Sequence, residues 1–253
     1  KSKNYDYTTK FSNSNPLNNI KIEFKKIFIL ISNSKMRFIV YDTETTGLPK
    51  YRKAPPSKSN LYPYICQMSW LVYDDKTEKL HTRDYIIKLP EGVTIPEECT
   101  KIHGITNEKM MAEGVEISKV LDEFTRDWMK CHILVAHNID FDNRIIQAEY
   151  HRNQPINWLG RHRKIEYCTM LYGKKFTNIQ VPSKFNSGTY QKPPKLIELH
   201  KELFKTEPSN LHNSLIDVLA CFRCFYKMVY NEDIVNETKH KEFYNYYNEK
   251  CGL

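Results

Sequence analysis

Two carboxylates stand at the end of the first strong strand expected in the chain. Asp42 and Glu44 are two residues apart where the expected strand at 37–42 ends. Side chains alternate between the two faces of a strand, so both carboxylates should point to the same face. Like charges on one face repel, and hard carboxylate oxygens suit Mg²⁺ or Mn²⁺. This pair predicts a divalent-cation site, with a solvated strand end as the alternative.

A second pair of acids follows another short apolar strand. Asp140 and Asp142 come after the run Ile133-Leu134-Val135, where a helix is expected to begin. Ligands in open α/β sheets commonly bind at such strand-to-helix junctions. The alternative is that one of these acids is only the N-cap of the helix.

The third signal is a histidine five residues before an acid at the start of an apolar helix. His212 and Asp217 would lie about 140° apart on a regular helix, because each residue turns the helix by about 100°. If both serve one site, His212 must lie at or before the first turn. Otherwise His212 caps or packs and Asp217 is a surface acid.

These motifs in this order resemble the DEDDh, or DnaQ-like, 3′-5′ exonuclease family of the RNase H-like superfamily. That family includes proofreading subunits of DNA polymerases and ribonuclease T. The motifs are D-x-E, H-N-x-x-F-D and H-x4-D, and residues 102–106 match an H-G-I-T loop of the proofreading type. The resemblance runs from about Met36 to Tyr230. Asn213 and Ser214 stand where relatives often have Arg-Ala, and neither is a proposed ligand.

The resemblance assigns a role to each matching residue. It implies that two Mg²⁺ ions per site, for which Mn²⁺ can substitute, are held by four acids: Asp42, Glu44, Asp142 and Asp217. The implied general base is His212, since an unperturbed imidazole titrates near working pH. The implied contacts with the substrate are Thr45, Leu48, Phe141 and His103. Core packing is an equal alternative for Phe141, and Asp140 is read as a supporting or capping acid.

The implied activity is removal of nucleotides from the 3′ end of single-stranded DNA or RNA, with release of nucleoside 5′-monophosphates. Two divalent ions about 3.5–4 Å apart can activate water and stabilise the leaving oxygen. One alternative is a non-catalytic nucleic-acid-binding or adaptor module on the same fold, and another is a two-metal nuclease that cuts internally. The protein partner could be a polymerase or a second copy of the chain, and the sequence does not choose between them.

Basic runs could contact the phosphates that an acidic centre repels. The charge of the whole chain is +8. One run lies between Pro49 and Pro63, a segment without acids, and two more lie at 161–164 and 174–175. The first contains Lys50, Arg52, Lys53 and Lys58. Such runs suit non-specific phosphate contacts, although a charge run is more often simply a solvated surface.

The order of the expected elements defines the fold class. Strands are expected at 37–42, 66–73 and 82–89, and shorter strands at 133–135 and 165–169. The expected helices are 117–130, 141–152, 195–204 and 211–229. A meander followed by alternating helices and strands indicates a mixed sheet covered by helices. The resemblance implies a mixed central sheet of three antiparallel strands and then parallel ones, flanked by helices. This α/β pattern agrees with the RNase H-like fold that the resemblance implies.

Composition divides the chain into three parts. Residues 1–35 carry seven Lys against Asp6 and Glu23 and precede the first Met of the sequence, so we expect a disordered leader or an upstream extension. The exonuclease domain is expected at 36–230 and a polar C-terminal segment at 231–253. No apolar run approaches the ~20 residues of a membrane span. With seven cysteines and no zinc-ribbon spacing, we expect an intracellular protein of the cytoplasm or nucleus.

Overall fold

The computed structural model describes residues 36–51, 53–154, 156–161, 164–183, 187–208 and 212–252. Residues 35–253 form one compact unit. The leader expected at 1–35 lies outside the described residues and stays a prediction.

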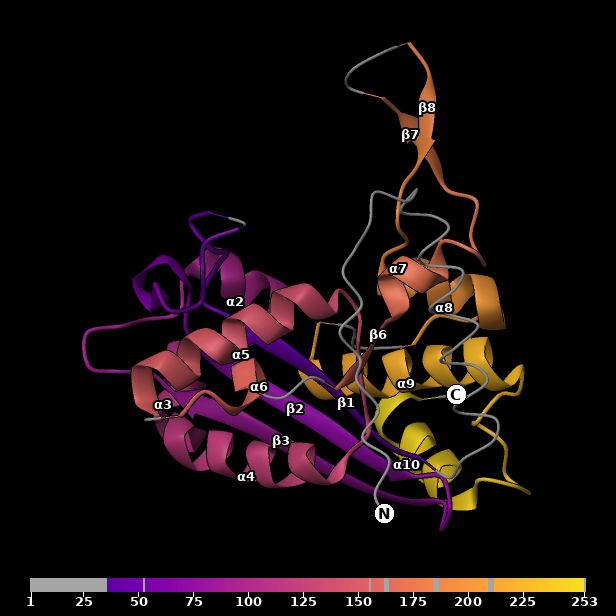
Figure 1. The fold of residues 1–253 in the computed structure, drawn as a ribbon, viewed down its shortest axis with the longest axis horizontal. Coiled ribbons are helices and arrows are strands. Elements are labelled where there is room, and N and C mark those ends of the chain that lie inside the picture. The colour runs from indigo at the N-terminus through magenta and orange to yellow at the C-terminus, as the bar shows by residue number, and fades with distance from the viewer. Residues whose placement is uncertain are drawn as a thin grey trace, which may run out of the picture. The chain divides into compact units, whose positions relative to one another are not determined.

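A six-stranded mixed sheet forms the centre of the unit (Figure 1). Its first three strands in the chain are antiparallel, and two later strands run parallel to the first. The order across the sheet is β4 (Val115–Glu116), β3 (Lys79–Lys88), β2 (Ile65–Asp74), β1 (Arg37–Thr45), β5 (Ile133–Ala136) and β6 (Ile165–Cys168). The predicted mixed sheet of the RNase H-like fold is therefore confirmed.

Alternation along β1 and β2 separates two apolar layers. On one face, Tyr41 pairs in register with Trp70, and both rings meet Phe124 of helix α4 (Ile117–Lys130) edge to face. On the other face, Phe38 packs against Phe225 of helix α9 (Ser214–Tyr230). Because Asp42 follows Phe38 and Val40 in the same alternation, its side chain lies on the α9 face of the sheet.

The third long helix is α5 (Ile139–Asn153), which begins shortly after β5. The structure also contains short helices that the sequence did not predict, and a small hairpin. They are η1 (Ser59–Leu61), α2 (Glu97–His103), α3 (Asn107–Glu113), α6 (Trp158–Arg161), α7 (Thr169–Gly173), β7 (Gln180–Pro182) and β8 (Thr189–Gln191). Helix α8 (Leu196–Phe204) lies within the expected range 195–204.

The C-terminal segment contains a helix that the sequence did not predict, α10 (Lys241–Cys251). Its residues Phe243, Tyr247 and Cys251 are buried, and the Tyr247 hydroxyl lies 3.0 Å from Nε2 of His200 in α8. The segment at 231–253 therefore contributes to the apolar interior. None of the described helices has the length and apolar composition that crossing a bilayer requires.

Candidate active site

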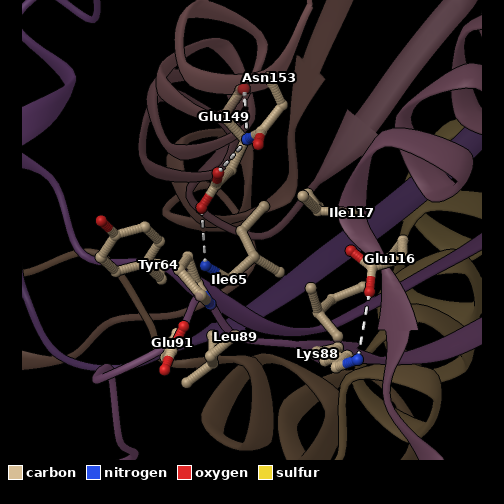
Figure 2. A pocket seen from close by; sticks show the side chains of 11 residues that line it. Tyr64, Ile65, Lys88, Leu89, Glu91, Glu116, Ile117, Glu149 and Asn153 are labelled. Atoms are coloured by element: carbon tan, nitrogen blue, oxygen red, sulfur yellow. Dashed lines mark hydrogen bonds and ion pairs between the residues drawn. The ribbon is translucent and has the colours of Figure 1, made fainter.

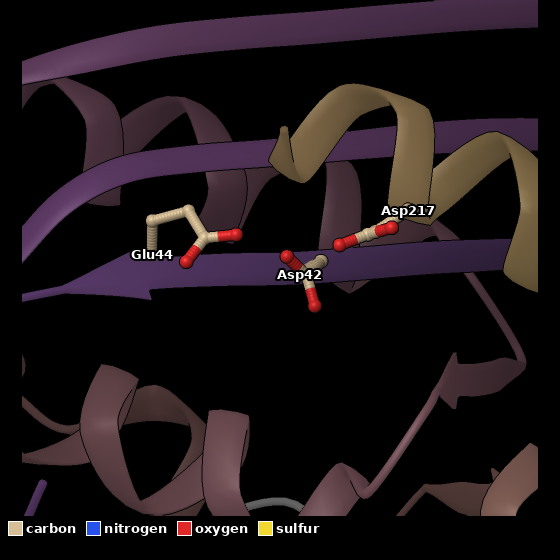
Figure 3. Close-up of side chains that lie close together, drawn as sticks. All are labelled: Asp42, Glu44 and Asp217. Carbon is tan, nitrogen blue, oxygen red and sulfur yellow. The ribbon is translucent and has the colours of Figure 1, made fainter. Parts of the chain in front are cut away.

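Two elements bring three acids together on the α9 face of the sheet. Asp42 and Glu44 project from β1, and a register shift between Glu44 and Thr45 marks where the regular ladder with β2 ends. Asp217 lies in the first turn of α9. Carboxylate oxygens of these three residues lie within 4.8 Å of one another (Figure 3). The same-face placement of Asp42 and Glu44 follows from the alternation of the strand.

The three acids are held in an environment that opposes their ionisation. Burial raises the pKa of Asp42. Burial and then the charges of Asp42 and Asp217 raise the pKa of Glu44, while burial and then the charge of Asp42 raise that of Asp217. Each group must either take up a proton or face a cation. Three clustered carboxylates are a donor set that hard divalent ions favour, so these residues fit a metal ion.

The fourth predicted ligand, Asp142, lies beside this cluster but is not part of it. Asp142 is in the first turn of α5 and is 2% exposed. Its Oδ1 accepts hydrogen bonds from the backbone N–H of Thr43 (3.1 Å) and from the Thr43 hydroxyl (2.9 Å). Burial, followed by the charge of Asp42, raises the pKa of Asp142. Both of these hydrogen bonds are accepted by Oδ1 of Asp142.

His212 lies just outside helix α9. Its backbone has a left-handed φ of 72°, and it precedes Asn213, whose side chain caps the helix by accepting from the N–H groups of Leu215 and Ile216. The N–H of His212 donates to Oδ2 of Asp217 (3.3 Å), while the residue as a whole is exposed. The structure therefore places His212 before the first turn, which is where it would have to lie if His212 and Asp217 serve one site.

Two further residues position the acids and were not predicted. The Ser214 hydroxyl donates to the Asp42 carbonyl (2.7 Å), and the Ser214 N–H donates to Oε1 of Gln67 on β2 (3.3 Å). These bonds fix the start of α9 against β1 and β2, and so fix Asp217 relative to Asp42. The only sequence signal was the Asn213-Ser214 pair, which departs from the pattern of the relatives.

The predicted substrate contacts fall into two groups. Leu48 and Phe141 line one cavity of about 280 Å³, together with Pro49, Asn138, Asp140 and Arg144. Leu48 is 81% exposed, whereas Phe141 is partly buried and also packs against the core. The two interpretations of Phe141, substrate contact and core packing, thus each agree with part of its surroundings.

His103 and Thr45 form the second group and contact each other. Nδ1 of His103 accepts from the N–H of Ile105 (3.1 Å), Nε2 lies 3.6 Å from Sγ of Cys66, and the ring also hydrogen-bonds the Thr45 backbone. Burial lowers the pKa of His103, so the ring is neutral. The Thr45 hydroxyl donates to the Gly47 carbonyl (2.7 Å). His103 therefore supports the bend at the end of β1.

One lysine of the basic run at 161–164 has a structural role. Nζ of Lys164 donates to the carbonyls of Cys131 (2.5 Å) and Met129 (3.2 Å) and lies 4.4 Å from the ring centre of Trp128. Such a lysine packs against the protein and does not present its charge to a ligand. Residues 162 and 163 of the same run lie outside the described residues.

The fold and this acid cluster define the chain as a DnaQ-like nuclease domain of the RNase H-like superfamily. The ribonuclease T exonuclease family matches residues 39–225, which is most of the described unit. The chain belongs to this exonuclease family.

Known relatives and solved structures agree with that assignment. DNA polymerase III of the PolC type from Staphylococcus aureus is 32% identical over 119 residues, which are 46% of this chain and only 7% of that polymerase. A structure of exonuclease I superposes with a TM-score of 0.57 at 17% identity, covering 84% of this chain and 43% of the other. E. coli exonuclease I in complex with a dA16 oligonucleotide gives a TM-score of 0.55 at 16% identity, with 84% and 43% covered. At these identities the superpositions show the shared fold.

Proposed function

We propose that this chain is a metal-dependent 3′-to-5′ exonuclease that removes nucleoside 5′-monophosphates from single-stranded DNA or RNA. The observation that carries the proposal is the cluster of Asp42, Glu44 and Asp217, with their oxygens within 4.8 Å, beside the exposed residue His212. Membership of the exonuclease family and the exonuclease I fold support it. The match to a polymerase supports a polymerase partner, with a second copy of the chain as the alternative.

Asp42, Glu44 and Asp217, together with Oδ2 of Asp142, are the groups that would hold two Mg²⁺ ions, for which Mn²⁺ can substitute. When bound, such ions supply charge neutralisation and an acidified water. The carboxylates of the chain would fix the position of this positive charge, which offsets their repulsion of the reacting phosphate.

His212 would accept the proton of the attacking water. Its side chain lies outside α9, and its backbone N–H is fixed by Asp217. An imidazole so placed is not fixed by the helix, while the backbone of the same residue stays bonded to one of the acids. A positioned base of this kind contributes about 10²–10⁴-fold to the rate.

The remaining contacts would select a chain end. Leu48 and Phe141 would enclose the terminal base in the 280 Å³ cavity. Thr45 would meet the 3′ hydroxyl, and His103 would act through Thr45, whose backbone its ring holds.

The test is digestion of 5′-labelled single-stranded DNA and RNA in Mg²⁺ or EDTA. A ladder that shortens from the 3′ end is expected only in Mg²⁺, and a 3′-terminal phosphorothioate linkage should block it. Asp42→Ala should abolish the ladder, whereas Asp122→Ala, at an exposed acid of α4 on the opposite face of the sheet, is the matched control and should retain it. Cleavage of circular single strands would favour an internal nuclease, and binding without cleavage would favour the adaptor module.

A further inference from the structure

The connection between β1 and β2, from Thr46 to Tyr64, begins two residues after Glu44. It contains no acid between Pro49 and Pro63. Lys50, Lys53 and Lys58 are all exposed, and none of the three forms an ion pair with a described residue. Tyr51, between the first two lysines, is 67% exposed. The connection therefore presents positive charge and an aromatic ring next to the acid-bearing strand.

An arginine of α5 fixes the part of this connection that leads into β2. The guanidinium of Arg152 donates to the carbonyls of Pro63 (3.1 Å) and Tyr62 (2.6 Å) and also to that of Ser59. The same group lies over the ring of Tyr64, 4.2 Å from its centre. One side chain thus satisfies three backbone carbonyls of a segment with little regular structure.

A buried carboxylate orients that arginine. Glu149 is 2% exposed and lies 2.8 Å from Nη1 of Arg152. It also accepts from the Ile65 N–H (3.1 Å), where β2 begins, and from the side chain of Asn153 (2.9 Å) (Figure 2). Because each oxygen of Glu149 has a partner, the pair forms a specific anchor between α5 and the connection.

The part of the connection next to β1 is also held by hydrogen bonds. The N–H of Thr46 donates to the Tyr64 carbonyl and that of Lys50 to the Leu61 carbonyl, each at 2.9 Å. These bonds close the segment on itself at its base. A surface ordered before binding loses little conformational entropy when a ligand arrives.

The cavity of about 280 Å³ lies between this connection and the start of α5. Leu48 and Pro49 line it from one side and Asn138 and Phe141 from the other. Phe141 is the neighbour of Asp142 in the chain. Because Leu48 and Pro49 belong to the connection, a terminal nucleotide in this cavity would lie against it, with the rest of the strand close by.

We propose that the connection is a preorganised phosphate-binding surface for the nucleic-acid strand that leads away from the scissile bond. Lys50, Lys53 and Lys58 contact backbone phosphates, and Tyr51 offers a face on which a base stacks. This inference rests on the proposed nuclease function. Continuity with the cavity beside the acids favours a nucleic acid over other anionic partners.

The test replaces all three lysines with alanine and compares the variant with a second triple variant, Lys76→Ala, Lys79→Ala and Lys241→Ala. Those three lysines are exposed and have no ion-pair partner among the described residues; Lys76 and Lys79 follow the opposite end of β2. The measurement is kcat/KM for a single-stranded 20-mer between 50 and 200 mM salt. A second substrate, the p-nitrophenyl ester of thymidine 5′-monophosphate, has no upstream phosphates.

The wild type should lose about 20-fold more kcat/KM across this salt range than the first variant, since three single-strand phosphate contacts change the logarithmic slope by about 2. Hydrolysis of the ester should be unchanged, and the control triple variant should match the wild type. Arg152→Lys, which retains the charge without the planar fork, should raise KM for the 20-mer alone.

An unchanged salt slope in the first variant would overturn the inference, as would an equal loss on the ester. If anionic vesicles bind through these lysines while the slope is unchanged, the surface belongs to a membrane. Failure of the wild type to hydrolyse either substrate would instead refute the proposed function.

Discussion

Replacing Glu44 with glutamine should stabilise the metal-free protein while weakening its metal site. Glu44 has two acidic neighbours, Asp42 and Asp217, with oxygens within 4.8 Å. Unit charges at that distance repel by about 0.9 kcal/mol in water and about 3.5 kcal/mol at an effective dielectric constant of 20. Because Glu44 is partly exposed, we expect a gain of about 2 kcal/mol in the free energy of unfolding when all three are ionised.

The sign of the pH dependence follows from the direction of the pKa shift. Burial and then neighbouring charge raise the pKa of Glu44 in the folded state. Between its unfolded value, about 4.3, and this raised value, the folded protein binds more protons than the unfolded chain. The free energy of unfolding of the metal-free wild type therefore falls as pH rises through that window. Glu44→Gln removes the contribution of Glu44 to this fall. The free energy of unfolding of the variant should therefore exceed that of the wild type only slightly at pH 4.5 and by most at pH 9.

The assay is urea unfolding in EDTA, followed by the fluorescence of the buried residues Trp70 and Trp128. Glu237→Gln, at an exposed acid without an ion-pair partner among the described residues, is the matched control. Mg²⁺ at 100 times its Kd should stabilise the wild type by about 2.7 kcal/mol and the Glu44 variant much less. If the variant is less stable than the wild type at pH 9, or if the difference is the same at both pH values, the electrostatic reasoning is refuted.

Two further substitutions separate chemistry from packing. His212→Ala should retain stabilisation by Mg²⁺ in a thermal shift assay yet lose at least about 100-fold in single-turnover rate, and a wild-type rate would contradict the role of a base. Lys164→Ala should lower the free energy of unfolding by about 1–2 kcal/mol, because it loses two carbonyl contacts and the contact with the Trp128 ring. The nuclease rate per folded molecule should not change, and a weaker affinity for single strands would show instead that this lysine contacts phosphate.

The long elements of the fold could be predicted because their own residues specify them. Helix α4 has the predicted bounds, 117–130, since its apolar residues recur at helical spacing. Helices α2 and α3 have seven residues each, and their buried members Cys99 and Met110 pack against residues from β2 and the end of β3. Helices this short depend on tertiary packing, which no local pattern reveals.

Some features of the candidate site could likewise be predicted from local sequence, whereas others depend on tertiary packing. Strand alternation placed Asp42 and Glu44 on one face, and helical spacing placed His212 ahead of Asp217. The hydrogen bonds of Asp142 with Thr43 join residues that are 99 positions apart. The orientation of that carboxylate depends on how α5 packs on β1, so it could not be read from either motif.

The local structure at the start of α9 positions both Asp217 and His212. Asp217 must stay on the helix close to Asp42, whereas a base must lie outside the helix and remain accessible. The left-handed backbone of His212 turns the chain away, Asn213 caps the helix, and the hydroxyl of Ser214 holds it to the Asp42 carbonyl. A left-handed conformation costs a residue other than glycine about 1–2 kcal/mol, and a carboxylate in the first turn is favoured by the helix dipole. The five-residue spacing thus places His212 outside the helix while its backbone N–H still bonds Asp217.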